Sequence, residues 1–150
     1  MARAVGVDLG ERRIGVAVSD RTGTLASPRQ TIERLGDRDR DLAAVADLAV
    51  EEEAATVVVG LPLSLDGRRG AAARAAEDDA GGLSDLLRPH GIDVVLWDER
   101  LTTVSAAAAL TSAGRRVRDQ RAVIDQSAAA VLLQSWLDAQ TPRPPVTSPQ

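Results

Sequence analysis

The chain has 150 residues, of which 44% are hydrophobic and 27% are charged, a composition typical of one globular domain. It contains no cysteine, which excludes disulfides, thiolate metal sites and cysteine nucleophiles, so a metal could be bound only by oxygen atoms or by His90. The net charge of −4 excludes a uniformly basic nucleic-acid surface, and the absence of Phe and Tyr excludes base stacking on those residues.

Hydrophobic periodicity predicts strands at first and then alternating helices and strands. Alternating and β-branched apolar runs indicate the strands, and spacings of three and four residues, as in Leu42, Val45 and Leu48, indicate the helices. The predicted strands cover 4–8, 14–18, the segment around 30–32, 56–59 and 93–97. The predicted helices cover 38–53, 70–87, a segment from Thr102 or Thr103 to Gly114, and 123–140.

This order of elements predicts an α/β domain in which the strands joined through helices pair in parallel. We expect the domain to span residues 1–140 and the proline-rich residues 141–150 to form a flexible tail. No secretory leader and no apolar run of membrane-spanning length are present, so a cytoplasmic location and no membrane partner are expected.

Acidic residues follow two of the predicted strands, at Asp8 and at Asp98–Glu99. Sites in sheets of this kind gather at the carboxyl ends of the strands, so these carboxylates are candidate site residues. Two structural alternatives stand beside this interpretation. Asp8 could bind the amides of the following turn, and Asp98–Glu99–Arg100 could be a charged loop.

Asp125 shares a helical stripe with the apolar residues Ala129, Leu132 and Trp136 if the last helix begins near Val123. A carboxylate on a buried face needs a cation, a metal or a proton, although Asp125 could instead be the N-cap of this helix. Carboxylates that converge from separate segments form a hard-oxygen site that suits Mg²⁺ or Mn²⁺ and the hydrolysis of phosphodiesters.

Four segments together resemble the signature blocks of the family named "putative pre-16S rRNA nuclease", which is also described as Holliday-junction-resolvase-like. They occur in the family's order as GVDLGERRIGVAV (6–18), VGLPLSLDG (59–67), DERLTT (98–103) and VIDQSAAA (123–130). The resemblance implies an RNase H-like domain with a five-stranded mixed sheet and a metal-dependent nuclease that trims the 5′ end of precursor 16S rRNA.

The same resemblance assigns the catalytic and metal-binding roles to Asp8, Glu99 and Asp125, with Asp98 as the reserve metal ligand. True resolvases of this superfamily carry an acid on the strand that here ends in Gly60. The second acid of this chain is therefore expected to come from the Asp-Glu-Arg block.

Arginines cluster around these acidic positions and are candidate phosphate-binding residues, because the guanidinium fork can bind two phosphate oxygens. A solvated charged loop is the alternative interpretation of such a cluster. The candidates are Arg12, Arg13, Arg100, Arg115, Arg116, Arg118 and Arg121.

Three other functions compete with rRNA processing. The Asp8-Leu-Gly block also resembles the phosphate loop of actin-like ATPases, but those close two domains over the nucleotide and this chain supplies one. A resolvase that cuts branched DNA would normally act as a dimer, and the sequence is compatible with a monomer or a homodimer. A non-catalytic nucleic-acid-binding assembly factor would need no metal.

Overall fold

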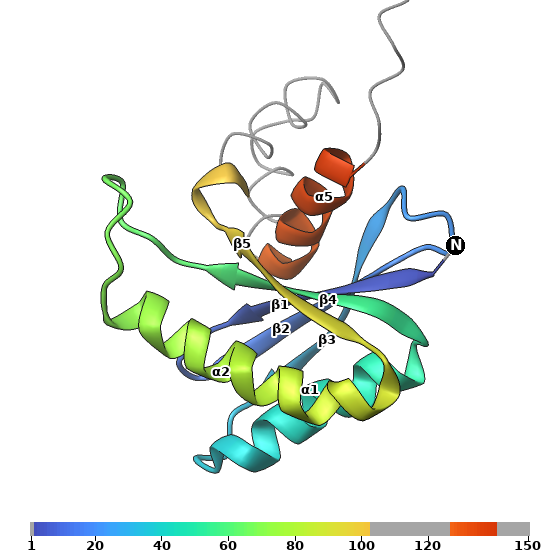
Figure 1. Cartoon of the computed structure of the whole chain (residues 1–150), viewed down its shortest axis with the longest axis horizontal. Helices are drawn as coiled ribbons and strands as arrows, with labels where there is room; N and C mark the ends of the chain where they lie inside the picture. Colours follow the sequence, from blue (N-terminus) through green and yellow to red (C-terminus); the bar gives the residue numbers. More distant parts are fainter. Residues whose placement is uncertain (1, 103–126, 141–150) are drawn as a thin grey trace, which may run out of the picture.

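The computed structural model describes residues 2–102 and 127–140, which form a five-stranded mixed sheet with helices on both faces (Figure 1). The elements are β1 (Arg3–Leu9), β2 (Arg13–Ser19), β3 (Ala26–Glu33), α1 (Arg38–Glu51), β4 (Ala54–Leu61), α2 (Ala71–Leu87), the 3-10 turn η1 (Arg88–His90), β5 (Asp93–Asp98) and α5 (Ala128–Gln140). The predicted fold class and the five predicted strands are confirmed.

The strand order is β3-β2-β1-β4-β5. β1, β2 and β3 are antiparallel neighbours, whereas β4 and β5 run parallel to β1, because α1 and α2 carry the chain back between them. The β1–β2 turn is tight, with the Gly10 amide donating to the carbonyl of Arg13 at 2.9 Å. The carboxyl ends of β1, β4 and β5 therefore lie at one edge of the sheet.

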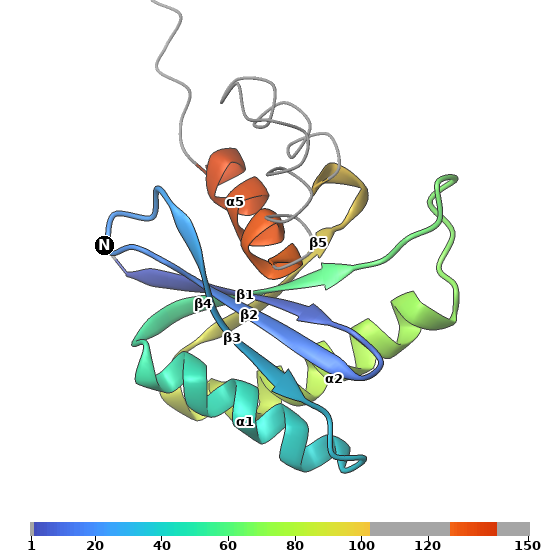
Figure 2. The ribbon, with the colours of Figure 1, turned by 180° about the vertical axis from the view of Figure 1, so that it is seen from behind.

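The strands alternate between two cores on opposite faces of the sheet. Val7 belongs to the core under α1 and α2, and Ala4 belongs to the core under α5. Figures 1 and 2 show α1 and α2 together on one face and α5 on the other. Gly6 allows α5 to approach closely, since a Cβ there would lie 2.7 Å from Leu133 Cβ. Asp8 continues the Ala4–Gly6 side of β1 and therefore faces the α5 layer.

The last helix begins at Ala128, so the predicted start at Val123 is wrong. Ser127 caps the helix, because its Oγ accepts from the Ala130 amide at 3.3 Å. Because Ser127 precedes the first helical residue, α5 does not extend through it to the predicted start. The stripe predicted to join Asp125 to the apolar face of the last helix stays untested. Asp125 itself lies outside the described residues.

Several predictions fall on parts of the chain that the structure does not describe. These are the helix predicted from Thr102 or Thr103 to Gly114, the tail at 141–150, and the arginines Arg115, Arg116, Arg118 and Arg121. Within the described ranges, none of the helices is long and apolar enough to cross a membrane.

Candidate active site

Asp8 and Glu99 meet at the sheet edge, with Gly60 between them. Asp8 lies on β1, Gly60 on the neighbouring β4, and Glu99 directly after β5. The Glu99 amide donates to the Leu61 carbonyl at 3.0 Å, which extends the parallel ladder one residue beyond β5. Glu99 thus follows the alternation of Trp97, which belongs to the core under α5, and faces the same side of the sheet as Asp8.

Gly60 provides the space that the Glu99 side chain occupies. A Cβ at position 60 would lie 2.9 Å from Glu99 Oε1 and 3.1 Å from its Cγ and Cδ. Any larger residue would therefore displace the carboxylate. The glycine at position 60 therefore leaves the space that lets the acid following the next strand reach this position.

The two carboxyl groups are electrostatically coupled. Burial and, after it, the neighbouring Asp8 together raise the pKa of Glu99 to about 7. Burial also raises the pKa of Asp8, opposed by its side-chain hydrogen bond with Glu99. No arginine in the described part of the chain contributes to the pKa shift of either group. The pair therefore holds a proton near neutral pH unless a cation takes its place.

Asp98 is neutralised by its own neighbour. Arg100 donates from Nε to Asp98 Oδ1 at 3.0 Å and from Nη2 to Oδ2 at 2.6 Å. These contacts lower the pKa of Asp98 below its usual value. Asp98 thus has a full counter-charge, whereas Glu99 has none among residues 2–102 and 127–140, and Glu99 is the acid of this block that meets Asp8.

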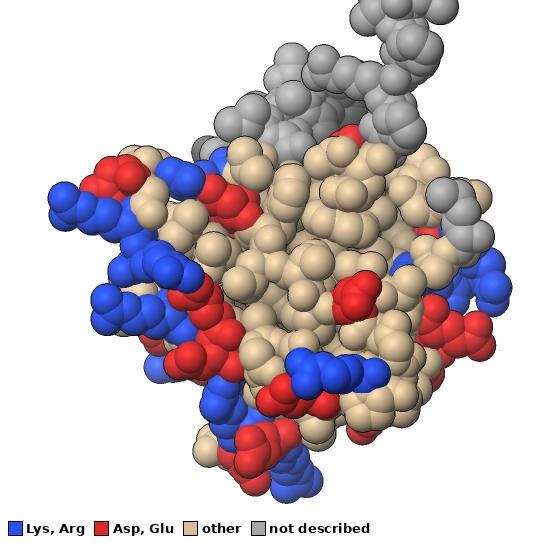
Figure 3. Space-filling model, viewed as in Figure 1, with Lys and Arg blue, Asp and Glu red and all other residues tan. Residues whose placement is uncertain are grey.

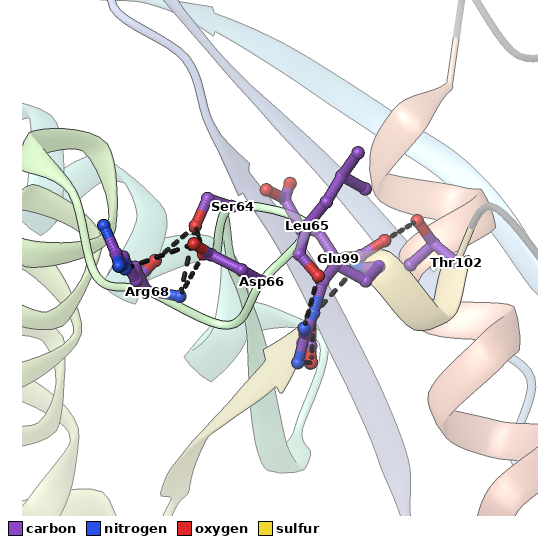
Figure 4. Close-up of polar contacts among 8 residues, drawn as sticks. Ser64, Leu65, Asp66, Arg68, Glu99 and Thr102 are labelled. Atoms are coloured by element: carbon purple, nitrogen blue, oxygen red, sulfur yellow. Dashed lines mark hydrogen bonds and ion pairs between the residues drawn. The ribbon is translucent and has the colours of Figure 1, made fainter.

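The residues that follow β5 hold the backbone of Glu99 and connect it to the loop after β4 (Figure 4). Thr102 Oγ1 donates to the Glu99 carbonyl at 2.6 Å. Arg100 Nη1 also donates to the Leu65 carbonyl at 3.4 Å. The loop is itself ordered, because the Arg68 amide donates to Ser64 Oγ at 3.1 Å.

A cleft of about 540 Å³ lies beside Asp8 on the α5 side of the sheet. Its walls come from the β2–β3 hairpin and from the N-terminal end of α5, and include Arg13 and Ser127. Ser127 is two residues from Asp125 in the sequence. Within residues 2–102 and 127–140 no group of three His, Asp or Glu side chains could hold a metal ion.

The structure separates the three candidate arginines that it describes. Arg13 lines the cleft with Asp8 and forms an exposed ion pair with Glu33 at 3.2 Å. Arg12 lines another hollow, near the start of α1, and Arg100 is bound to Asp98. On the described surface in Figure 3, basic and acidic side chains are interspersed and form no continuous basic face.

No function was assigned from the sequence to Gly60, or to Gly15 and Thr31 in the cleft. Gly60 could have been found from the alternation of side chains along β5. This alternation places Glu99 on the same face of the sheet as Trp97, over the neighbouring strand that contains Gly60. For Gly15 the signal is the hairpin register, because this residue pairs directly with Asp8. Thr31 then follows as the residue that pairs with Gly15 on β3.

The fold is shared with solved resolvase structures. "T. thermophilus RuvC in complex with Holliday junction substrate" superposes with a TM-score of 0.61 and 14% identity, covering 93% of this chain and 96% of that one. The yeast mitochondrial Holliday junction resolvase Ydc2 gives a TM-score of 0.57 and 10% identity, covering 91% and 78%. These identities establish the fold class alone, which is the RuvC-like RNase H fold.

Sequence comparison adds the family. Residues 2–139 match the model described as "RuvX: Holliday junction resolvase". The "Putative pre-16S rRNA nuclease" of Mycobacterium leprae (strain Br4923) is 50% identical over 136 residues, which cover 91% of this chain and 72% of that protein. The protein of the same name from Rhodococcus opacus (strain B4) is 49% identical over 139 residues, covering 91% and 77%. The chain belongs to the RuvX family of nucleases.

Proposed function

We propose that this protein is a divalent-metal-dependent nuclease that processes the 5′ end of precursor 16S rRNA in the bacterial cytoplasm. The observation that carries the proposal is the meeting of Asp8 and Glu99 over Gly60 without a compensating arginine among the described residues. The rRNA substrate is supported by the names of relatives whose sequences are 50% and 49% identical to this chain.

The donor set fits Mg²⁺ or Mn²⁺. Both described acids offer hard carboxylate oxygens. Burial is the main cause of their raised pKa values, and no described arginine lowers either of them. Asp8 and Glu99 would hold the metal, with Asp125 as the third ligand, because Ser127 close to it in the chain lines the cleft beside Asp8. When bound, the metal supplies an activated water and stabilises the leaving oxygen of the phosphodiester.

The chain's own residues prepare this site. Asp8 and Glu99 must first release the proton that they share, because a metal binds the ionised carboxylates. Gly60 leaves room for both side chains on one face of the sheet. The Glu99 backbone is fixed by Leu61 on one side and Thr102 on the other, which keeps its carboxylate oriented toward Asp8.

Cleavage of branched DNA is the second candidate function. The description of the matching family and the RuvC-like fold favour it. The same acidic pair would serve either substrate, since both reactions hydrolyse a phosphodiester. A non-catalytic assembly factor would bind nucleic acid but would not require these carboxylates.

The test is incubation of the pure protein with precursor 16S RNA and with a four-way DNA junction, each with Mn²⁺ and with excess chelator. We expect metal-dependent cleavage of the RNA at its 5′ side. Asp8→Asn should abolish cleavage and retain nucleic-acid binding, whereas Asp47→Asn, an exposed position on α1, should behave as wild type. Cleavage of the junction alone would favour the second function, and undiminished cleavage in chelator would contradict metal catalysis.

A further inference from the structure

We propose that the cleft beside Asp8 seats one ribonucleotide of the substrate strand, next to the phosphate that is cut. This inference rests on the proposed function, because it assigns a subsite to the same active site. The cleft has a volume of about 540 Å³, which is within the usual range for pockets that hold one small molecule. It accommodates a single unpaired nucleotide rather than a duplex.

The floor of the cleft follows from the strand register. Asp8 pairs with Gly15 on β2, and Gly15 pairs with Thr31 on β3, so that the three residues form one row across the sheet. A Cβ on Gly15 would lie 3.8 Å from Asp8 Cβ and 3.5 Å from Ala129 Cβ. A group resting on Gly15 is therefore in contact distance of the acid on one side and close to Thr31 on the other.

Thr31 provides a hydrogen-bonding group for the sugar. Its side chain is exposed and lines the cleft. Within the described ranges, none of the recorded side-chain hydrogen bonds involves this hydroxyl. A threonine hydroxyl both donates and accepts, as does a ribose 2′-hydroxyl, which is the group that distinguishes RNA from DNA.

Arg13 provides the contact to the phosphate. It lines the cleft and is paired with Glu33 at 3.2 Å, with about 70% of both side chains exposed (69% and 71%). An exposed pair of this kind is weak, and a phosphate offers the guanidinium a stronger bidentate partner. Nucleotide binding thus releases Glu33. Glu33→Gln should accordingly lower the KM for the RNA, by about two- to threefold.

The steric test is Gly15→Ala in the full-length protein, assayed with an RNA that spans the 5′ end of precursor 16S rRNA and with Mn²⁺. The added methyl makes ordinary contacts with its neighbours, so the fold is retained, but it occupies the cleft floor. We expect the KM to rise by about five- to tenfold, as for loss of one good contact. Gly81→Ala is the control, because nothing lies within 4 Å of its Cβ position. An unchanged KM in Gly15→Ala would overturn the proposal.

The chemical test combines Thr31→Val with a scan of single 2′-deoxy substitutions around the cut. In the wild type, one flanking position should lose about fivefold in kcat/KM when its 2′-hydroxyl is removed. Thr31→Val should show no further loss at that position, while Ser27→Ala, an exposed hydroxyl on β3 outside the cleft, should retain the wild-type sensitivity. Sensitivity that persists unchanged in Thr31→Val would overturn the ribose assignment.

Failure of the proposed function can be distinguished from failure of the proposed subsite. If the wild type cleaves neither the RNA nor the junction, the proposed function is wrong, but the subsite is still testable by binding. The cleft is then tested by the affinity of the same variants for the same RNA, measured by fluorescence anisotropy. Weaker binding by Gly15→Ala than by Gly81→Ala would support the cleft, and equal binding would overturn it.

Discussion

Gly60 determines whether two carboxylates can meet at the sheet edge. Gly60→Ala places a Cβ 2.9 Å from Glu99 Oε1, and the flexible end of Glu99 can move away at little cost to the fold. We expect kcat to fall by about 10²-fold, as for loss of a transition-state contact, while stability stays within about 1 kcal/mol. Activity and thermal unfolding of Gly60→Ala and Gly81→Ala measure this. Equal kcat in the two variants would contradict the geometry.

The shared proton predicts a pH dependence of stability when metal is removed by chelator. The folded state keeps the Glu99 proton up to a pKa of about 7, whereas the unfolded state releases it near 4.5. The free energy of unfolding should therefore fall as the pH rises through this window. Because Glu99 is partly exposed to solvent, the change should be only about 1 kcal/mol.

Glu99→Gln removes this titration and should flatten the pH profile of stability between those two values. Urea unfolding of both proteins at several pH values measures the effect. Added Mn²⁺ should reverse the sign for the wild type, because the metal binds the deprotonated pair. Parallel profiles of wild type and Glu99→Gln in chelator would show that Glu99 is an ordinary exposed acid.

Helix α5 depends on a close approach to β1 at Gly6. A Cβ there would lie 2.7 Å from Leu133 Cβ and 2.9 Å from the Ala129 carbonyl oxygen, so the helix backbone would have to shift. We expect Gly6→Ala to destabilise the fold by about 1–3 kcal/mol, as overpacked cores do. Gly15→Ala, on the same face but with a nearest contact of 3.5 Å, is the control. Matching urea midpoints for the two variants would contradict this packing.

The elements were predictable from sequence wherever the pattern of hydrophobic residues was strong. The runs that became β1, β2, β4 and β5 and the periodic faces of α1 and α2 required no tertiary information. The start of α5 was not predictable in this way, because the apolar spacing continues upstream of Ser127 and the cap became evident only from its hydrogen bond to Ala130.

The acidic pair was partly predictable. The rule that sites gather at the carboxyl ends of strands led to Asp8 and to Asp98–Glu99. The family resemblance favoured Glu99 over Asp98, but the physical reason for that choice lies in the register of β5 against β4 and in the position of Arg100. The space above Gly60 also depends on that register, which local sequence does not specify.

The charge of the whole molecule shapes how it can bind nucleic acid. With a net charge of −4, affinity must come from a local group of arginines, and Arg115, Arg116, Arg118 and Arg121 are the proposed group. Three or four contacts to single-stranded phosphates give a slope of log affinity against log salt of roughly −2 to −3. Arg115→Ala with Arg116→Ala should flatten it by about one to one and a half units.

The matched control for this experiment is Arg74→Ala with Arg88→Ala, which changes the net charge by the same amount. Arg74 lies on α2 and Arg88 directly after it, on the face of the sheet opposite to α5. Its salt slope should equal that of the wild type. If both double variants keep the wild-type slope, the phosphate contacts must be sought at Arg12, Arg13 and Arg100 instead.

The central claim is that Asp8 and Glu99 together form the metal-dependent active site. Separate substitution of the adjacent acids Asp98 and Glu99 tests this claim most directly. The measurement is the single-turnover rate of precursor 16S RNA cleavage at saturating Mn²⁺ for Glu99→Gln and for Asp98→Asn. We predict that Glu99→Gln loses at least about 10²-fold, whereas Asp98→Asn, whose carboxylate is already bound by Arg100, stays within about tenfold of wild type. The reverse order, with Asp98→Asn inactive and Glu99→Gln active, would contradict the account.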